Sequence, residues 1–191
     1  MTTLTAAGPV DDVAKSVLDR ARRGDHEAFA ALIRHYDPGL RALTYRLLGD
    51  RDRMDDALQD AYVKAFTALP RFRGSAKVGT WLYRIVYNVC LDELRRARRN
   101  RQVLLEEAGL RGSTRDAGDE VAGRGDLARA LAGLTPEDRA AVLLVDAQGF
   151  SYVEAGQVLD VPAGTIASRL NRARAELREV LGRNAEGAAR R

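Results

Sequence analysis

The chain has 191 residues and a formal net charge of +4 at pH 7, and its length suits either one medium-sized domain or two small ones. A mild basic excess favours contact with polyanions. A single cysteine, Cys90, excludes an internal disulfide and matches a reducing compartment. No segment approaches the roughly 20 apolar residues that cross a bilayer, so the sequence favours a cytoplasmic protein without membrane insertion.

The predicted secondary structure is helical throughout. Helical periodicity is nearly continuous over residues 11–99 and 126–181, whereas strand signals are scarce, so we predict an all-α fold. Pro38, Gly49 and Pro70 are expected to interrupt the helices of the first segment. The expected helices there cover about 12–23, 25–36, 53–69 and 80–99, with residues 40–48 as a further stretch and with Asp25 and Thr80 as N-caps.

A low-complexity stretch divides the chain in two. Residues 100–125 hold five glycines among Ser, Thr, Asp and Arg, which is typical of a flexible linker. We therefore predict two small helical domains, at residues 11–99 and 126–182. Residues 1–10 and 183–191 are predicted to be disordered tails.

Residues 151–174 predict two short helices joined by a tight turn. Ser151 and Glu154 have the spacing of a capping box at the start of the first helix. Asp160 tolerates the left-handed conformation of a sharp turn, and Pro162 suits the first turn of the next helix. The apolar positions of the first helix are Tyr152, Val153, Val158 and Leu159. The apolar stripe of the second is Ile166, Leu170, Ala173, Leu177 and Leu181.

The side of this second helix opposite to the stripe has the character of a DNA groove reader. It carries Ser168, Asn171, Arg172 and Ala175, with Thr165 on one flank. Thr165 and Ser168 offer hydroxyls, Arg172 offers a guanidinium, and the first acid, Glu176, comes late. A narrow, polar and cationic surface of this kind fits the major groove. The alternative interpretation is an ordinary helical hairpin whose arginines keep the surface hydrated.

The helix expected over residues 53–69 has an acidic outer face. Asp55, Asp56, Gln59 and Asp60 all lie off the centre of its apolar stripe. Clustered carboxylates can bind a metal or act as an acid–base pair, but no His or Cys accompanies them at ligand spacing. Acids in a first helical turn are also expected from the helix dipole. We interpret this face as a protein-binding surface and predict no catalytic residue, no metal site and no cofactor.

Aromatic and cationic side chains alternate over residues 71–101. Trp81 falls on the apolar side of a helix and is interpreted as a core anchor. The arginines after Leu94 repel one another unless a polyanion or an acidic partner neutralises them, so phosphate contact is the economical explanation. The polar loop 73–79 could accept an unpaired base. The arginine cluster comprises Arg95, Arg96, Arg98, Arg99 and Arg101.

These segments together resemble the extracytoplasmic-function (ECF) family of bacterial RNA polymerase sigma factors. The first part of the resemblance lies in DDALQDAY at 55–62, FRG at 72–74 and TWLYRI at 80–85, followed by Asn88, Asp92 and Arg95-Arg96. The second part lies in GFSY at 149–152, GTI at 164–166, SRL at 168–170 and RAR at 172–174. The two parts occur in the family's order, with a linker between them.

The resemblance implies a promoter-specificity subunit with two helical domains, a sigma-2-like bundle and a sigma-4-like helix-turn-helix unit. The implied partners are core RNA polymerase, through the clamp of its large subunit and its flap region, promoter DNA, and a possible anti-sigma factor. Core binding is implied for Asp55, Asp56, Gln59 and Asp60, and contact with the minus-ten element for Lys77, Arg84, Asn88, Arg95 and Arg96. Contact with the minus-thirty-five element is implied for Thr165, Ser168, Asn171 and Arg172, with Arg169 and Arg174 holding phosphate or structure.

Several residues depart from the family pattern, among them Val78, which replaces a frequent Phe in the loop 74–79. The chief departures lie in the helix-turn-helix segment. Ala167 stands where a Lys or Arg is common, Gly156 where Ala is usual, and Asp160 where Gly usually makes the turn. Two other classes compete with the sigma-factor interpretation. A stand-alone helix-turn-helix regulator leaves the acidic helix and the arginine segment without a joint purpose. A nucleic-acid enzyme lacks a nucleophile, a phosphate loop or a metal cluster, and the two histidines, His26 and His35, are interpreted as surface or packing residues.

Overall fold

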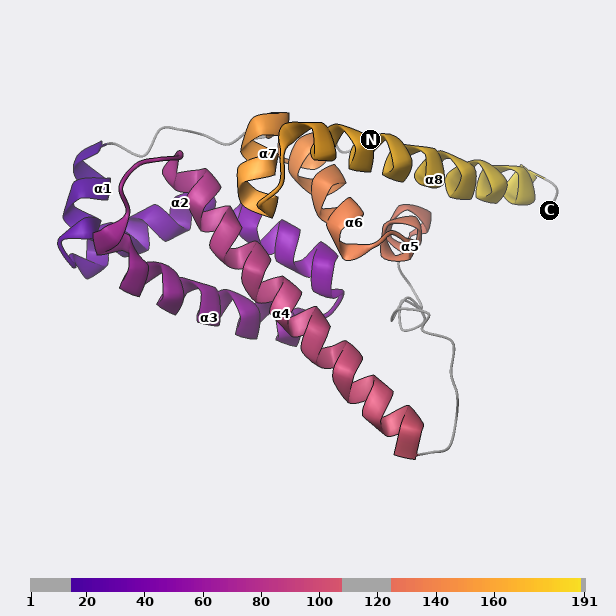
Figure 1. Cartoon of the computed structure of the whole chain (residues 1–191), viewed down its shortest axis with the longest axis horizontal. Coiled ribbons are helices and arrows are strands. Elements are labelled where there is room, and N and C mark those ends of the chain that lie inside the picture. The colour runs from indigo at the N-terminus through magenta and orange to yellow at the C-terminus, as the bar shows by residue number, and fades with distance from the viewer. Residues whose placement is uncertain (1–14, 108–124, 190–191) are drawn as a thin grey trace.

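The computed structural model describes residues 15–107 and 125–189, with side chains for residues 15–105 and 125–182. All elements in these ranges are helices, which confirms the predicted all-α class. They form two units that lie side by side (Figure 1). We call α1 to α4 the N-terminal unit and α5 to α8 the C-terminal unit.

The N-terminal unit is built around one long buried helix. Its elements are α1 (Lys15–Arg22), α2 (His26–Leu48), α3 (Arg51–Ala68), the 3-10 turn η1 (Leu69–Arg71) and α4 (Val78–Glu107). Helix α2 packs against α1, α3 and α4. Asp25 caps it as predicted, since its carboxylate accepts a hydrogen bond from the amide of Ala28. The fully buried leucines of the unit include Leu32, Leu40, Leu43, Leu58 and Leu82.

The prediction that Pro38 interrupts the helix is wrong. Helix α2 runs through Pro38 without a break and ends at Gly49, whose φ of 78° gives the left-handed cap. Proline inside a helix removes one hydrogen bond and costs about 3 kcal/mol. The apolar stripe of α2 continues on both sides of Pro38, and its residues Leu32, Leu40 and Leu43 are fully buried. Burial of that continuous stripe outweighs the local penalty.

Both ends of α4 differ from the prediction. The helix begins at Val78, so Thr80 is not its N-cap but a buried residue whose hydroxyl makes no hydrogen bond. It continues to Glu107, so residues 100–107 of the predicted linker are helical, because they are good helix formers without a glycine. Helix α8 likewise covers most of the predicted C-terminal tail. The remaining linker residues 108–124 and the predicted tail 1–10 lie outside the described residues.

The C-terminal unit contains a bent helix pair, as predicted. Its elements are α5 (Asp126–Gly133), α6 (Pro136–Val142), the π-helical turn η2 (Leu143–Ala147), α7 (Tyr152–Leu159) and α8 (Ala163–Ala189). The capping box is present, because Ser151 Oγ accepts from the amide of Glu154 at 3.2 Å and Glu154 Oε2 accepts from the amide of Ser151 at 2.9 Å. Asp160 adopts the expected left-handed conformation, with φ 58°.

The apolar stripes of this pair are buried only in part. In α8, Ile166, Leu170 and Ala173 are fully buried, while Leu177 and Leu181 are half-buried. In α7, Val158 and Leu159 are buried, as predicted. The other two apolar positions of α7, Tyr152 and Val153, are 41% and 62% exposed. They stand in the first turn of α7, ahead of the segment that meets the core.

Close packing explains why the chain has Gly at position 156, where the family usually has Ala. A Cβ on Gly156 would lie 2.6 Å from the backbone oxygen of Val161 in the turn that follows, which is closer than real Cβ contacts come. We therefore expect Gly156→Ala to lower the free energy of unfolding by about 1–3 kcal/mol through overpacking. Thermal unfolding of the full chain measures this, with Gly164→Ala as control, because a Cβ there meets nothing within 4 Å. An unchanged melting temperature for Gly156→Ala would contradict the close approach.

Cys90 is a buried thiol with 0% exposure. Burial raises its pKa to about 12, against a smaller opposing effect from a hydrogen bond with Thr44. The thiol therefore stays protonated and packed at neutral pH.

The two units share a continuous apolar core. Helix α4 packs against α7, and α2 packs against α5 and α6. Arg139 of α6, 8% exposed, donates to the backbone oxygen of Leu47 in α2 at 3.1 Å and to those of Ala132 and Leu134 in its own unit at 2.7 and 3.1 Å. Buried donors of this kind fix the relative position of the units. Among the described residues, no helix combines the length and apolar character needed to span a membrane.

Candidate nucleic-acid interface

The outward face of α8 is polar and narrow. Ser168 and Asn171 are exposed on it, and Thr165 is half-exposed one turn earlier. The Ser168 hydroxyl donates to the backbone oxygen of Thr165 at 2.9 Å, so its oxygen can still accept a hydrogen bond. The structure thus brings these three predicted groove contacts onto one side of the helix.

Arg172 and Arg174 are held by acids of the same unit. Arg172 donates through Nε and Nη2 to both carboxylate oxygens of Asp138 at 2.9 and 2.7 Å. Arg174 makes the same forked contact with Asp146 at 3.1 and 2.6 Å. These hydrogen bonds raise the pKa of both guanidinium groups. The forked contacts hold both guanidinium groups in fixed orientations.

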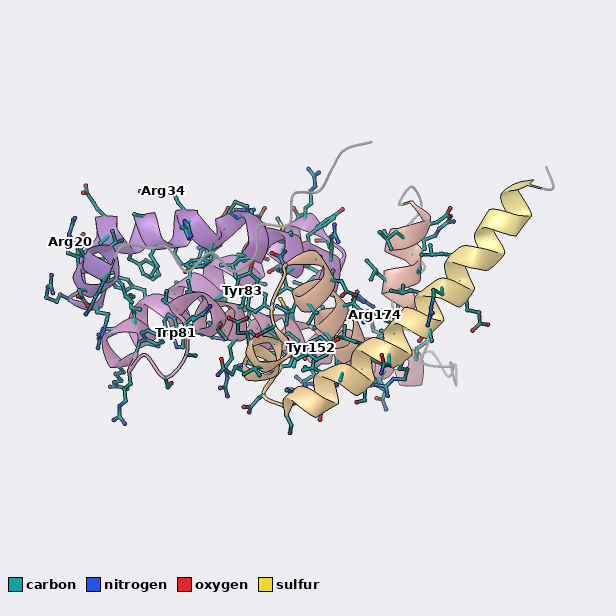
Figure 2. All side chains as sticks on the ribbon, turned by 90° about the horizontal axis from the view of Figure 1, so that it is seen from above. Arg20, Arg34, Trp81, Tyr83, Tyr152 and Arg174 are labelled. Carbon is teal, nitrogen blue, oxygen red and sulfur yellow. The ribbon has the colours of Figure 1, made fainter. Side chains whose placement is uncertain are left out.

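The two pairs differ in burial. The Asp138 side chain is 3% exposed, whereas that of Arg172 is 62% exposed, so a buried carboxylate holds a guanidinium that reaches the surface. Asp146 and Arg174 are both partly exposed. Figure 2 shows Arg174 beside Tyr152. Sequence reasoning missed Asp138 and Asp146, because their positions in α6 and η2 carry no signal of a contact with α8.

Arg169 does not share the outward face. It is half-buried and near Tyr87 of α4. Burial raises the pKa of Tyr87 to about 12, Glu137 raises it further, and the positive charge of Arg169 opposes the shift. The charge of Arg169 is thus felt at Tyr87 in the N-terminal unit.

The second cationic face lies along α4 and just before it. Arg84, Asn88 and Arg95 follow one another at spacings of four and seven residues, which places them on one side of the helix, and all three are exposed. Lys77, directly before α4, is also exposed. This face meets the C-terminal unit at its first half: Lys77 Nζ lies 3.1 Å from Glu154 Oε1, and Arg84 Nη2 lies 3.0 Å from Asp160 Oδ1.

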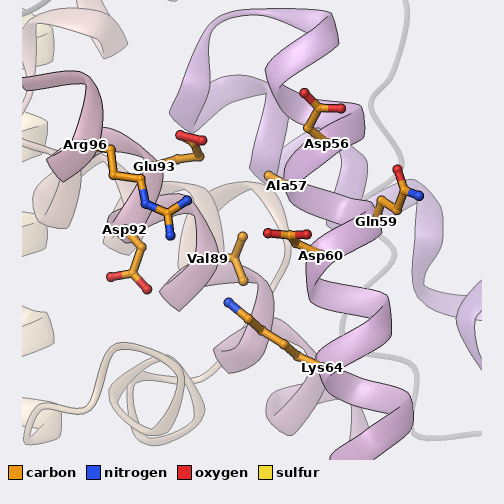
Figure 3. A pocket seen from close by; sticks show the side chains of 9 residues that line it. All are labelled: Asp56, Ala57, Gln59, Asp60, Lys64, Val89, Asp92, Glu93 and Arg96. Atoms are coloured by element: carbon orange, nitrogen blue, oxygen red, sulfur yellow. The ribbon is translucent and has the colours of Figure 1, made fainter. Parts of the chain in front are cut away.

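Arg96 is separated from the other predicted minus-ten residues. It lies about a third of a turn away from Arg84 around α4, by the 100° rotation per residue. There it lines a cavity of about 170 Å³ between α3 and α4, together with Asp56 and Asp60 (Figure 3). Its guanidinium therefore lies among the carboxylates at the junction of α3 and α4 and not on the face with Arg84.

That acidic surface combines two helices. Asp56, Gln59 and Asp60 are exposed on α3, and α4 adds Asp92 and Glu93 to the same cavity. We call these five residues the acidic surface. Asp55 lies beside it and pairs with Arg41 of α2 at 2.6 Å. The residues Asp92 and Glu93 were missed because sequence spacing alone does not show that α4 crosses α3 at this point.

The described residues contain no group of three or more His, Cys, Asp and Glu side chains arranged to hold a metal. His26 stacks on Phe66, with ring centroids 4.8 Å apart, and His35 meets the edge of Tyr36 at the same separation. Trp81 packs against Phe72 at 5.2 Å and is half-buried, as expected of a core anchor. Most of the predicted site residues lie on three surfaces of the described part of the chain, which are the α8 face, the cationic α4 face and the acidic surface.

Comparison with known proteins assigns both units to one class. The Sigma-70 region 2 family matches residues 32–100, and the Sigma-70 region 4 family matches residues 124–177. The chain is 40% identical over 159 residues to the ECF RNA polymerase sigma factor SigM of Mycobacterium tuberculosis H37Rv, covering 83% of this chain and 80% of SigM. It is 28% identical over 179 residues to SigW of Bacillus subtilis 168, covering 87% and 96%.

Two solved structures share the arrangement. CnrH in complex with the cytosolic domain of CnrY matches with a TM-score of 0.66 and 26% identity, covering 87% of this chain and 96% of CnrH. RpoE with the anti-sigma factor NepR from Bartonella quintana matches with a TM-score of 0.65 and 29% identity, covering 81% and 96%. This chain belongs to the ECF family of RNA polymerase sigma factors.

Proposed function

We propose that this ECF sigma factor binds core RNA polymerase through the acidic surface, contacts the minus-ten element through α4 and reads the minus-thirty-five element through α8. The observation that carries the proposal is the presence, in one chain, of a slim polar face on the second helix of a helix-turn-helix and of an exposed acidic surface on a separate helical unit. The slim polar helix face is what a protein needs to read a DNA groove. The acidic surface gives the same protein a separate place to bind the polymerase.

For the minus-thirty-five element we assign direct groove contact to Thr165, Ser168 and Asn171. Arg172 reaches the same face, where its buried partner Asp138 would hold the guanidinium in a fixed orientation towards a base edge. Arg169 and Arg174 are assigned to phosphate or to structural support.

For the minus-ten element we assign contact to Lys77, Arg84, Asn88 and Arg95, which are exposed near one another along α4. A minus-ten contact by Arg96 would require DNA to reach the side of α4 that faces α3. The core-binding residues are Asp56, Gln59 and Asp60, with Asp55 beside them. The N-terminal unit would thus serve the polymerase and the minus-ten element, and the C-terminal unit the minus-thirty-five element.

We infer further that the chain has no catalytic activity of its own and works in the cytoplasm, where its polymerase and DNA partners are. An anti-sigma factor is a further expected partner, because the similar RpoE was solved with NepR. Affinity purification of the tagged chain from its native cell tests for such a partner.

The alternative of a stand-alone regulator gives the acidic surface no purpose. Run-off transcription with core polymerase distinguishes the two functions, because a sigma factor starts transcripts at a defined site in the absence of any other specificity subunit. The expected result is a discrete product that depends on the chain. Duplex binding without polymerase and without any transcript would favour the regulator.

A further inference from the structure

Arg41 links α2 to α3 at the edge of the acidic surface. Its Nε donates to Asp37 Oδ2 at 3.0 Å within α2, and its Nη1 donates to Asp55 Oδ1 on α3 at 2.6 Å. The hydroxyl of Tyr62, on α3, donates to the other oxygen of Asp37 at 2.7 Å. Burial and the hydrogen bond with Asp37 raise the pKa of Tyr62, so its hydroxyl stays a donor at neutral pH. Two acids and a tyrosine thus fix one guanidinium.

The network leaves part of this guanidinium for a group from outside. An arginine side chain has donors on Nε, Nη1 and Nη2, and the two acids use only the first two nitrogens. Within the part of the chain whose side chains are described, Nη2 has no recorded partner. The side chain is 46% exposed. A cation of fixed orientation therefore still has donors to offer at the surface.

The segment of α3 beside Arg41 is acidic. Residues 54–63 contain three aspartates and no Lys, Arg or His. Gln59 follows Asp55 by four residues, so the two lie on the same side of α3, and Figure 3 shows Asp56 and Gln59 along this helix. A partner that binds these acids needs cations. Arg41 would repel such a partner unless the partner also offers an acid at that point.

We propose that Arg41 is itself a contact of core RNA polymerase, and that its guanidinium, held by Asp37 and Asp55, binds a carboxylate on the polymerase. Guanidinium and carboxylate form strong charge-assisted hydrogen bonds, and a side chain that is already fixed loses little freedom on binding. The polymerase surface that fits here thus carries cations opposite the aspartates of α3 and an acid opposite α2. This inference rests on the proposed binding of polymerase by the acidic surface.

The alternative is that Arg41 only ties α2 to α3. The side chains of Asp37 and Asp55 are 31% and 58% exposed, and ion pairs of such exposure add little to stability. The two roles predict opposite signs for polymerase binding. Without Arg41, Asp55 loses its neutralising partner and the surface becomes more acidic. A cationic polymerase surface would then bind more tightly if Arg41 made no contact of its own.

Replacement of Arg41 by glutamine tests this sign. We expect Arg41→Gln to weaken binding to core polymerase about three- to tenfold at low salt, the scale of one partly exposed charged pair. Arg41→Glu should weaken it about thirtyfold or more, because two acids would then face each other across the interface. Arg41→Lys keeps the charge and should bind better than Arg41→Gln. The measurement is equilibrium binding of the tagged full chain to core polymerase.

Arg20→Gln is the matched control. Arg20, on α1, is 53% exposed and pairs with Asp25 at 2.6 Å, so its loss also breaks an exposed ion pair of the N-terminal unit. Polymerase affinity should stay unchanged in this variant. The melting temperatures of Arg20→Gln and Arg41→Gln should both stay close to that of the unsubstituted chain. Unchanged or tighter polymerase binding by Arg41→Gln would overturn the proposal.

A double-mutant cycle tests whether Asp55 acts through Arg41. Asp55→Asn removes one of the two acids that hold the guanidinium, and we expect it to weaken polymerase binding about twofold. In the Arg41→Gln background the same change should cost no further affinity, because nothing is left to hold. Additive effects would show that Asp55 does not position Arg41, contrary to the proposal.

The reversal Asp56→Arg separates this inference from the proposed function. Asp56 lies in the acidic surface itself, and its charge reversal should abolish polymerase binding whatever Arg41 does. If Asp56→Arg bound polymerase normally, the acidic surface would not be the interface and the proposed function would fail. If Asp56→Arg lost binding while Arg41→Gln kept it, the proposed function would stand and the role of Arg41 alone would fail.

Discussion

Replacement of Asp56 by arginine is expected to abolish co-purification of the chain with core RNA polymerase. Asp56 is exposed at the acidic surface, close to Arg96 and Lys64 around the same cavity. Charge reversal there removes an acid and creates a cluster of three cations, and like charges across an interface cost several kcal/mol. The measurement is recovery of the polymerase subunits on the tagged, purified chain.

The fold should survive this substitution, because Asp56 lies off the buried stripe of α3. Circular dichroism and the melting temperature check that point. Asp126→Arg provides a charge reversal of the same size at an exposed position of the C-terminal unit and should leave polymerase binding intact. Normal recovery of polymerase with Asp56→Arg would remove α3 from the proposed interface.

Replacement of Arg172 by alanine is expected to weaken binding to a minus-thirty-five duplex about ten- to a hundredfold, the scale of one good base contact. The same change leaves the buried carboxylate of Asp138 without its forked partner, so the C-terminal unit should also melt at a lower temperature. Affinity for duplexes with and without the preferred sequence, measured in parallel with thermal unfolding, separates the two effects.

The double variant Arg172→Ala with Asp138→Asn separates the effect on DNA affinity from the effect on stability. The amide removes the unpaired buried charge, and the melting temperature should recover in part. If Arg172 contacts DNA, the affinity stays low in the double variant. Recovery of affinity together with stability would instead show that Arg172 acts only through the fold.

Much of the fold could be predicted because its signals are local. The capping box at Ser151, the cap at Asp25 and the left-handed turn at Asp160 each depend on the residues within a few positions, and the structure contains all three. The buried stripe of α8 follows in the same way from spacing alone, as Ile166 and Leu170 show.

The errors arose where distant contacts decide the outcome. The continuation of α2 through Pro38 depends on burial against α1, α3 and α4, which no local rule contains. The grouping of Arg96 with the acids of α3 depends on how α3 and α4 cross. The forked pairs of Arg172 and Arg174, and the docking of Asp160 on Arg84, depend on partners at least 28 residues away in the chain. The sequence predicted DNA contacts for these arginines but did not show which acids hold them.

The π-helical turn η2 and the residue after it contact both α8 and the N-terminal unit. Its wider winding directs Asp146 to Arg174 on α8, while Gln148, directly after it, reaches Tyr83 and Gly39 in the other unit. Deleting a single residue here would return the segment to ordinary α-helical winding and swing everything beyond it by about 100°. The aspartate and the glutamine could then no longer both meet their partners, so the extra residue of this turn couples the orientation of the DNA-reading helix to the seating of one unit on the other.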